Sequence, residues 1–382
     1  MFLRCVSIFR PKLKIFLNLR LNVLVLCNFT ILKIYFRTSH ICYSMSFTLH
    51  RIFSVIFFLG ALVCFGQNSK SAKGFKDYFP IAERPFLAAG SGNNPYERIL
   101  LEAKPVVYYS IYNDIREALN RDTIVAGDAV YLSIQPHLRI YDANSKPVKT
   151  PSYKAFMGWQ SIIKTENNNF LTAAIESGHY SNGQSKSAFS EDFEDNTPES
   201  RALYEDITDD TNLAEILNRS SGNFSTNLTR LSLNYRINTF DEDNYPLQSH
   251  SFTIAYQIYH NRFLGVFQFG GYNPEDINIY GRHQIEAWYE FTSHLKKMRY
   301  SLTQRVFLHP DVHPSAEIYR SETSATLYPW DGDLGIMARF SFGFDDYNYR
   351  FVDSYPRFSV GLTWDWFTPF VVKPRKMQVP QQ

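Results

Sequence analysis

The chain has 382 residues, of which 45% are hydrophobic and 16% aromatic, and it contains four cysteines. This balance excludes collagen-like, disordered and disulfide-stapled proteins. Residues 1–66 carry eight Lys/Arg and no Asp/Glu, so residues 67–382 hold 31 basic against 37 acidic side chains. A net negative charge in this larger part argues against a nucleic-acid partner.

The first 66 residues resemble a targeting segment in their order of residue types. Within Met45–Gln67, the basic pair His50-Arg51 precedes the apolar stretch Ile52–Phe65, which is followed by a plausible cleavage point. This order is typical of a secretory signal peptide. The sequence therefore predicts an exported protein whose mature chain starts near Gln67.

The residues before Met45 have two interpretations. We interpret residues 1–44 as an extension upstream of the true start. The alternative is an additional membrane anchor through Ile15–Phe36, which Arg20 and Lys33 would weaken because charges at mid-span are costly in a bilayer.

Two kinds of structure are excluded from the rest of the chain. No run of 18 apolar residues occurs after residue 66, which excludes transmembrane helices there. Disulfides and thiol catalysis are excluded as well, because every cysteine precedes residue 67. The four are Cys5, Cys27, Cys42 and Cys64.

From about residue 104 onward, apolar and polar residues alternate with a period of two. Leu231, Leu233 and Tyr235, for example, are separated by single polar residues. Long alternating segments rich in Tyr and Phe predict one large antiparallel sheet. They lie near 128–141, 153–163, 170–181, 230–237, 252–258, 284–291, 298–308, 333–344 and 357–367.

The polar residues of these segments help to distinguish between two all-β architectures, a soluble sandwich and a transmembrane barrel. A soluble β-sandwich would have to accommodate Arg230, Arg236, Glu286 and Glu290 on an inner or thin solvent face. In a transmembrane antiparallel β-barrel they line the lumen while the apolar set faces lipid. The barrel is the better prediction, and closure with an even number of strands favours twelve.

The expected organisation after the signal peptide has three parts. Residues 67–103 form a periplasmic segment, residues 104–367 form the barrel, and residues 368–382 form a tail. The last strand, Arg357–Phe367, ends on an aromatic residue, as the closing strands of outer-membrane barrels commonly do. Loop 184–224 holds ten Asp/Glu against three Lys/Arg, and we interpret it as a solvated extracellular excursion.

Candidate chemistry lies in the segment Gly178–Gly183. Residues two apart on a strand point to the same face, so His179 lies within reach of the Ser181 hydroxyl. Both share parity with Leu171 and Ile175, which places them on the lipid-facing side. Polar groups there are costly unless they meet a polar partner or substrate.

Asn227 opens the next strand and supplies such a partner. It shares parity with Leu231 and Leu233, so it also faces lipid. Loop 184–224 joins the ends of the two strands, which brings Asn227 toward His179 and Ser181 at one rim. An amide beside an imidazole can fix its tautomer for proton abstraction from a serine.

These residues resemble the outer-membrane phospholipase A family, which carries an H-x-S-N-G motif followed, after a loop, by a strand that begins with asparagine. The matching residues here are His179, Ser181, Asn182, Gly183 and Asn227. A second stretch, Ser145–Tyr153, resembles the family's S-x-P-F-R-x-x-x-Y loop, with Val148 and Lys149 replacing its phenylalanine and arginine. The clear resemblance covers about residues 145–237.

The resemblance implies a twelve-stranded barrel in the outer membrane of a Gram-negative bacterium. It implies a calcium-dependent enzyme that hydrolyses acyl esters of phospholipids as a homodimer, with Ser181 as nucleophile, His179 as general base and Asn227 as the orienting amide. It also implies three calcium ligands, which are the main-chain carbonyl of Gln184, Asn223 and, from the second subunit, Ser145. Asn223 replaces a family serine and Gln184 an arginine.

Two other functions remain open. Lipid A deacylases are also outer-membrane barrels with a lipid-facing H-x-S-N motif, although they have about eight strands and an acidic third member. A non-catalytic barrel, acting as a porin or a surface-interaction protein, would retain the motif by descent. An outward-facing His179–Asn227 contact favours an enzyme, and an inward-facing pair favours a channel.

Overall fold

The structure is a computed structural model. It describes residues 78–92, 98–119, 126–143, 148–149, 151–165, 169–240, 246–262, 271–295, 298–329, 333–349 and 351–365. Every described residue belongs to one compact unit, which lies within Phe65–Gln382. The predicted signal peptide, Ser145, Phe367 and the tail 368–382 lie outside the described residues. Within them, no helix is long and apolar enough to cross a membrane.

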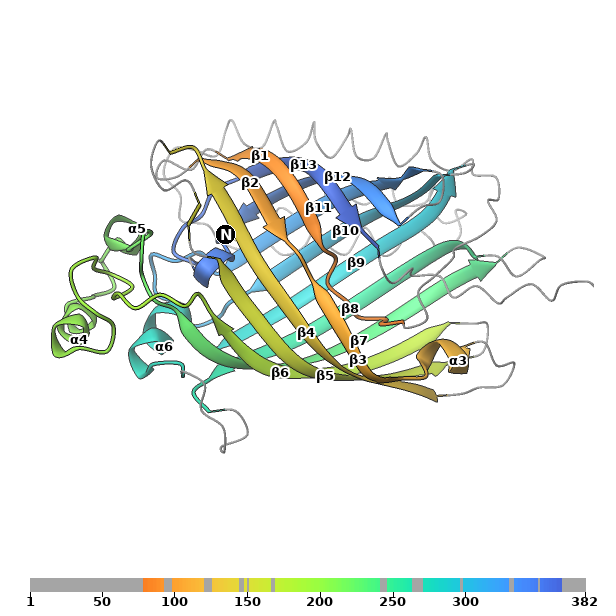
Figure 1. Cartoon of the computed structure of the whole chain (residues 1–382), viewed down its shortest axis with the longest axis horizontal. Helices are drawn as coiled ribbons and strands as arrows, with labels where there is room; N and C mark the ends of the chain where they lie inside the picture. The colour runs from red at the N-terminus through yellow and green to blue at the C-terminus, as the bar shows by residue number, and fades with distance from the viewer. Residues whose placement is uncertain are drawn as a thin grey trace, which may run out of the picture. The chain divides into compact units, whose positions relative to one another are not determined.

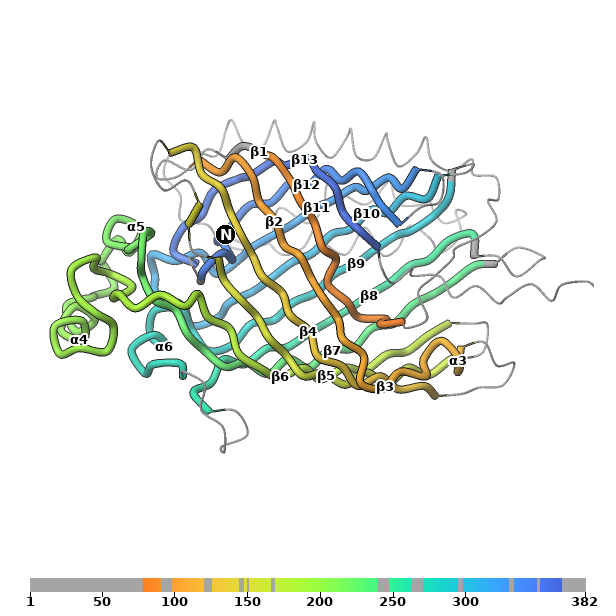
Figure 2. The backbone as a smooth tube through the Cα atoms, in the orientation of Figure 1, coloured from red at the N-terminus to blue at the C-terminus, as the bar shows by residue number. Residues whose placement is uncertain are grey.

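Thirteen β-strands form one sheet whose two ends meet (Figures 1 and 2). Strand β1 pairs antiparallel with β13 on one side and with β2 on the other, which closes the sheet into a barrel. The strands are β1 (Phe86–Gly92), β2 (Ile99–Lys104), β3 (Val107–Asn113), β4 (Ala126–Tyr141), β5 (Ser152–Lys164), β6 (Phe170–Ser181), β7 (Ser225–Phe240), β8 (Pro246–His260), β9 (His283–Leu295), β10 (Met298–Leu308), β11 (Tyr319–Tyr328), β12 (Leu334–Gly343) and β13 (Arg357–Trp364).

Strands β2 and β3 occupy a single position in the wall. Both pair with β4, β2 along its last residues and β3 along residues 129–134. Pro105 lies between them and interrupts the strand because it has no N–H to donate to the ladder. The thirteen strands therefore make a closed, twelve-stranded antiparallel barrel, as the sequence predicts.

The predicted start of the barrel is wrong. Strand β1 and most of β2 lie before residue 104 and belong to the wall, so Phe86–Gly92 and Ile99–Ala103 are not periplasmic. The alternation is hard to see there because β1 is built largely of small residues, FLAAGSG. Strand β11, YRSETSATLY, is also missing from the predicted segments, since its residues are polar on both faces.

The connections differ in length between the two ends of the barrel. At one end, the connections β6–β7, β8–β9, β10–β11 and β12–β13 are long. The first carries α4 (Pro198–Glu205) and α5 (Leu213–Ile216), and the second carries α6 (Pro274–Tyr280) (Figure 1). The last carries the 3-10 turn η4 (Tyr347–Tyr349). At the other end the turns are short, apart from the segment with α3 (Ile115–Leu119). Long loops are extracellular and short turns periplasmic in outer-membrane barrels.

Side chains alternate between the two faces of the wall. Leu231 and Leu233 on β7 are exposed on the outside, whereas Asn234 and Arg236 are buried inside. Glu286 on β9 is likewise buried and pairs with Arg230 at 2.8 Å. An apolar exterior around a charged, internally paired lumen suits lipid on one side and water on the other. The chain is a multi-pass β-barrel of the outer membrane.

Loop 184–224 is not a solvated excursion along its whole length. Leu213 is fully buried, and Phe189 and Phe224 belong to an aromatic cluster over the extracellular end of the barrel. Arg219 donates to Asp353 of loop 344–356 at 2.6 Å and 3.2 Å. The acidic side chains of the loop are mostly exposed, but its apolar residues pack onto the other loops and form a cap.

Candidate active site

The first part of the site is the extracellular end of β6. Tyr180 points inward and is buried against Phe224, with ring centroids 4.9 Å apart. Because neighbouring residues on a strand face opposite ways, His179 and Ser181 lie on the outer face, where both are half-buried. Gly178 allows β5 to approach, since a Cβ there would lie 1.9 Å from the Ala155 carbonyl oxygen.

The second part is Asn227 on β7. His179 and Asn227 are direct partners in the antiparallel register. The imidazole Nδ1 and the amide Oδ1 lie 3.1 Å apart, and Asn227 is only 1% exposed. The contact predicted from parity and loop position is therefore present, and it is on the outside of the barrel.

The orientation of the Asn227 amide sets the tautomer of His179. Asn227 Nδ2 donates to the main-chain carbonyl of Asn261 at 2.6 Å, so Oδ1 is the atom that faces the imidazole. An oxygen acceptor requires a proton on Nδ1. The Nε2 lone pair of the neutral ring then remains available to take a proton. Sequence reasoning missed Asn261, because a main-chain carbonyl leaves no signal in a residue pattern.

Ser181 is aligned with this pair without being bonded to it. It lies two residues from His179 on the same face of β6, where Cα atoms are about 7 Å apart. Among the described residues, no hydrogen bond joins the Ser181 hydroxyl to the imidazole. Such bonds are often long in ligand-free sites and tighten with substrate. The structure thus brings His179 and Asn227 together and places Ser181 beside them on the same face of β6.

Asn182 and Gly183 close the base of loop 184–224 beside the serine. The Asn182 side chain accepts from the Phe224 N–H at 3.0 Å and donates to the Gly222 carbonyl at 2.7 Å. Gly183 has φ +66°, in the left-handed region that favours glycine. The last two residues of the motif therefore fix where the chain leaves β6, which keeps Ser181 at the rim.

The residues implied as calcium ligands lie next to Asn182. Gln184 and Asn223 line a small void of about 20 Å³ together with Lys149. Asn223 Nδ2 donates to Asp195 at 2.6 Å, and burial raises the pKa of that carboxyl. Sequence reasoning missed Asp195, since it was one of ten acidic residues in the loop.

These groups fit calcium in their chemistry. Asn223, Asp195 and the Gln184 main chain supply hard oxygen donors, which calcium prefers. Lys149 brings a positive charge to the same void, but its ammonium lies 5.1 Å from the Tyr141 ring centroid. The third implied ligand, Ser145, lies outside the described residues. Groups of three or more His, Cys, Asp or Glu that could hold a metal do not occur in the described ranges.

A second row of polar side chains runs along the outer face, one step deeper than the His179–Asn227 pair. Thr229 Oγ1 lies 2.7 Å from Ser177 Oγ and 3.0 Å from His260 Nε2. His260 on β8 is the register partner of Asn227. These mutual bonds satisfy hydroxyl groups that would otherwise face hydrocarbon unpaired.

No family model and no curated protein matches the sequence. Among solved structures, the chain is similar to outer membrane phospholipase A from Escherichia coli, at 11% identity over 77% of this chain and 94% of that chain, with a TM-score of 0.42. It is also similar to LpxR from Salmonella typhimurium, at 8% identity over 70% of this chain and 88% of that one (TM-score 0.30). The β domain of the Bordetella autotransporter BrkA matches at 9% identity over 74% and 99% (TM-score 0.33). At these scores the similarities carry no argument about the site, whose chemistry is derived from its own residues.

Proposed function

We propose that the protein is a serine hydrolase that cleaves acyl ester bonds of phospholipids in the outer membrane. The observation that carries the proposal is the bond between His179 Nδ1 and Asn227 Oδ1 on the lipid-facing side of the wall. A catalytic pair in the lumen would meet water-soluble substrates. A pair on the outside, at the rim, meets the ester groups of lipids that surround the barrel.

The reaction follows from the tautomer. Ser181 Oγ attacks the ester carbonyl carbon while its proton passes to His179 Nε2, and the Asn227 oxygen stabilises the resulting imidazolium through Nδ1–H. When the tetrahedral intermediate collapses, the C–O bond to the lysolipid breaks and the leaving oxygen takes the proton from Nε2. An acyl-enzyme on Ser181 remains.

The second half of the reaction repeats these steps with water. His179 Nε2 takes a proton from a water molecule as that water attacks the acyl carbonyl carbon. The bond to Ser181 Oγ then breaks, the serine regains its proton from Nε2, and a fatty acid leaves. Each half needs one neutral imidazole nitrogen that faces the serine, which the Asn227 amide provides.

Calcium is part of the proposal. Bound calcium supplies Lewis-acid polarisation of the ester carbonyl, and the oxygens of Asn223, Asp195 and the Gln184 main chain would hold it. The family resemblance adds a homodimer in which the partner subunit supplies the ligand at the position of Ser145.

The experiment is hydrolysis of defined phospholipids by the purified barrel, with calcium or with a chelator. We expect fatty-acid release by the wild type in calcium, and release at the level of buffer for Ser181→Ala. The matched control is Ser161→Ala, which removes a serine from the same outer face near the other end of β5 and should leave the rate unchanged.

The alternatives give different results in the same assay. Release of acyl chains from lipid A alone would indicate a deacylase. The proposal would be overturned if the wild-type barrel released no acyl chain from either lipid while its heat-modifiable migration in gels showed that it was folded. The protein would then be a non-catalytic barrel.

A further inference from the structure

The lumen contains a segment of the chain itself. Residues Tyr78–Pro85 precede β1 and run inside the barrel, where Tyr78, Phe79 and Ile81 are buried. Phe79 packs against the rings of Tyr108 and Tyr131, at 5.1 Å and 5.0 Å between centroids. We call Tyr78–Pro85 the inner segment.

One wall residue forms hydrogen bonds with the main chain of the inner segment. The Gln160 amide on β5 accepts from the Ile81 N–H at 3.0 Å and donates to the Ile81 carbonyl at 2.7 Å. Gln160 also donates to Tyr131 at 2.9 Å and is fully buried. The Gln160 amide thus satisfies both the N–H and the carbonyl of Ile81, which have no neighbouring strand to pair with.

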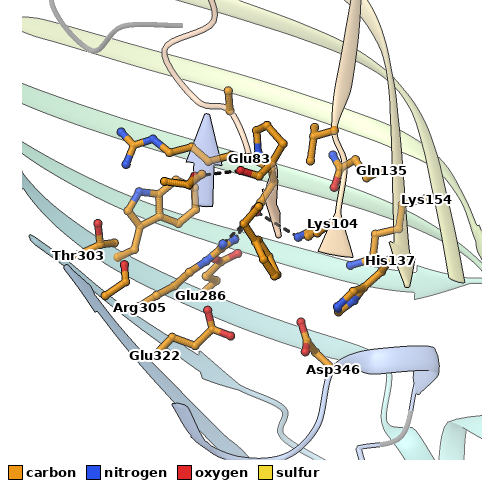
Figure 3. Close-up of a pocket in the computed structure, with 18 of the residues that line it drawn as sticks. Glu83, Lys104, Gln135, His137, Lys154, Glu286, Thr303, Arg305, Glu322 and Asp346 are labelled. Atoms are coloured by element: carbon orange, nitrogen blue, oxygen red, sulfur yellow. Dashed lines mark hydrogen bonds and ion pairs between the residues drawn. The ribbon is translucent and has the colours of Figure 1, made fainter. Parts of the chain in front are cut away.

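Glu83 ties the inner segment to three different strands. Its carboxylate accepts from both terminal nitrogens of Arg305 on β10, at 2.5 Å and 3.1 Å, and lies 3.2 Å from the Lys104 ammonium on β2. Arg230 on β7 is 3.8 Å away. Figure 3 shows Glu83 with Lys104 and Arg305 at the cavity that these side chains line.

Further bonds extend the attachment around the wall. Arg84 pairs with Glu290 on β9 through two contacts of 2.9 Å. The Pro85 carbonyl accepts from Thr363 on β13 at 2.9 Å, and the Tyr78 carbonyl accepts from Asn113 on β3 at 3.1 Å. The inner segment is thus bound to strands on all sides of the lumen.

We propose that the lumen wall is a binding site for a peptide segment that is not part of the sheet, that the inner segment occupies it, and that this bound segment closes the barrel to ions. A cavity of about 640 Å³ lies beside it and is bordered by Phe351 of the extracellular aromatic cluster. On this proposal the barrel is a closed chamber and does not act as a channel. This inference is independent of the proposed lipid hydrolysis, which takes place on the outer face.

The test measures ion efflux from liposomes that contain the full chain. The wild type should hold its ions. Glu83→Gln removes the charge that binds Arg305, Lys104 and Arg230, and leaves those cations partly unpaired in the lumen, so the segment should detach part of the time and efflux should rise about tenfold or more.

The matched control is Glu322→Gln. Glu322 lines the same cavity but pairs with Arg320 on its own strand, so this variant should stay as closed as the wild type. If Glu83→Gln failed to fold, Gln160→Leu, which removes the Ile81 bonds without removing a charge, would replace it.

The proposal is overturned if folded Glu83→Gln or Gln160→Leu leaks no more than Glu322→Gln. It is also overturned if the wild type itself leaks as an open pore does.

Discussion

At the scale of single residues, the site is defined by how polar groups are satisfied next to lipid. An unpaired buried amide or hydroxyl costs about 1–3 kcal/mol in proteins. Asn227 avoids this cost by accepting from His179 and donating to Asn261. Those same two bonds place the proton of the neutral ring on Nδ1 and leave Nε2 as the acceptor, which is the tautomer that the proposed proton transfer requires.

Substitution of Asn227 tests this role. Asn227→Ala removes the acceptor for Nδ1–H, so the imidazolium loses its stabilisation and kcat should fall about 10²-fold, with KM little changed. Asn227→Asp keeps an acceptor oxygen but loses the donor to Asn261, and it should retain more activity than the alanine variant. Equal kcat for Asn227→Ala and the wild type would contradict the orienting role.

Two glycines beside His179 and Ser181 should respond differently to substitution by alanine. At Gly178 a Cβ would collide with the backbone of β5, whereas at Gly183 it would meet no atom within 4 Å. Gly183→Ala therefore costs only the left-handed φ, about 1–2 kcal/mol, and Gly178→Ala should destabilise the barrel by more. Urea unfolding in detergent measures both, and the reverse order would contradict the register at His179.

At the scale of elements, strand register and loop packing position the site together. The β6–β7 register sets His179 opposite Asn227, while the Asn182 bonds return loop 184–224 to β7. The far part of the loop rests on α6, where Tyr204 donates to Asp276 at 3.1 Å. A cap built from several loops is thus connected to the serine through a few polar contacts.

This contact predicts a pH dependence of the cap. Burial raises the pKa of Asp276 to about 7, far above the value of about 4 for an ordinary Asp. At pH values between about 4 and about 7, the Asp276 carboxyl keeps its proton in the folded cap but has lost it in the unfolded loop. The contribution of Asp276 to stability is therefore full below pH 4, falls as the pH rises to about 7, and is constant above it.

Protease cleavage within loop 184–224 measures that effect. The difference in cleavage rate between wild type and Asp276→Asn should change between pH 4 and 7 and be constant above pH 7. His309 contributes in the opposite direction, because burial lowers its pKa to about 3 and stability is lost as the pH falls from about 6.5. The comparison with Asp276→Asn removes that contribution, and a difference independent of pH would contradict the buried carboxyl.

Much of this arrangement could be predicted from local sequence. Alternation gives the bounds of β6 and β10 to the residue, and parity alone places His179, Ser181 and Asn227 on the outer face. The inner segment could not be predicted in this way, since Glu83 and Arg305 are 222 residues apart. Asp195 and Asn261 were missed because only the folded loops bring them to Asn223 and Asn227.

At the scale of the whole molecule, the barrel separates two environments with different roles. The outer face carries the His179–Asn227 pair in an apolar belt. The lumen holds charged side chains that pair with one another, such as Arg139 with Asp345 at 2.6 Å and Arg299 with Asp365 at 2.6 Å. A charged lumen does not by itself indicate a channel here, because its carboxylates and guanidinium groups are largely bound to one another and to the inner segment.

The proposed hydrolase requires that His179 activates a lipid-facing Ser181. Labelling with a serine-directed fluorophosphonate in calcium, followed by peptide mass mapping, measures this activation. We predict a single adduct on Ser181 in the folded barrel, with labelling lost in His179→Ala and slowed in Asn227→Ala. No adduct on Ser181, or an adduct that forms equally fast without His179, would show that His179 does not activate the serine.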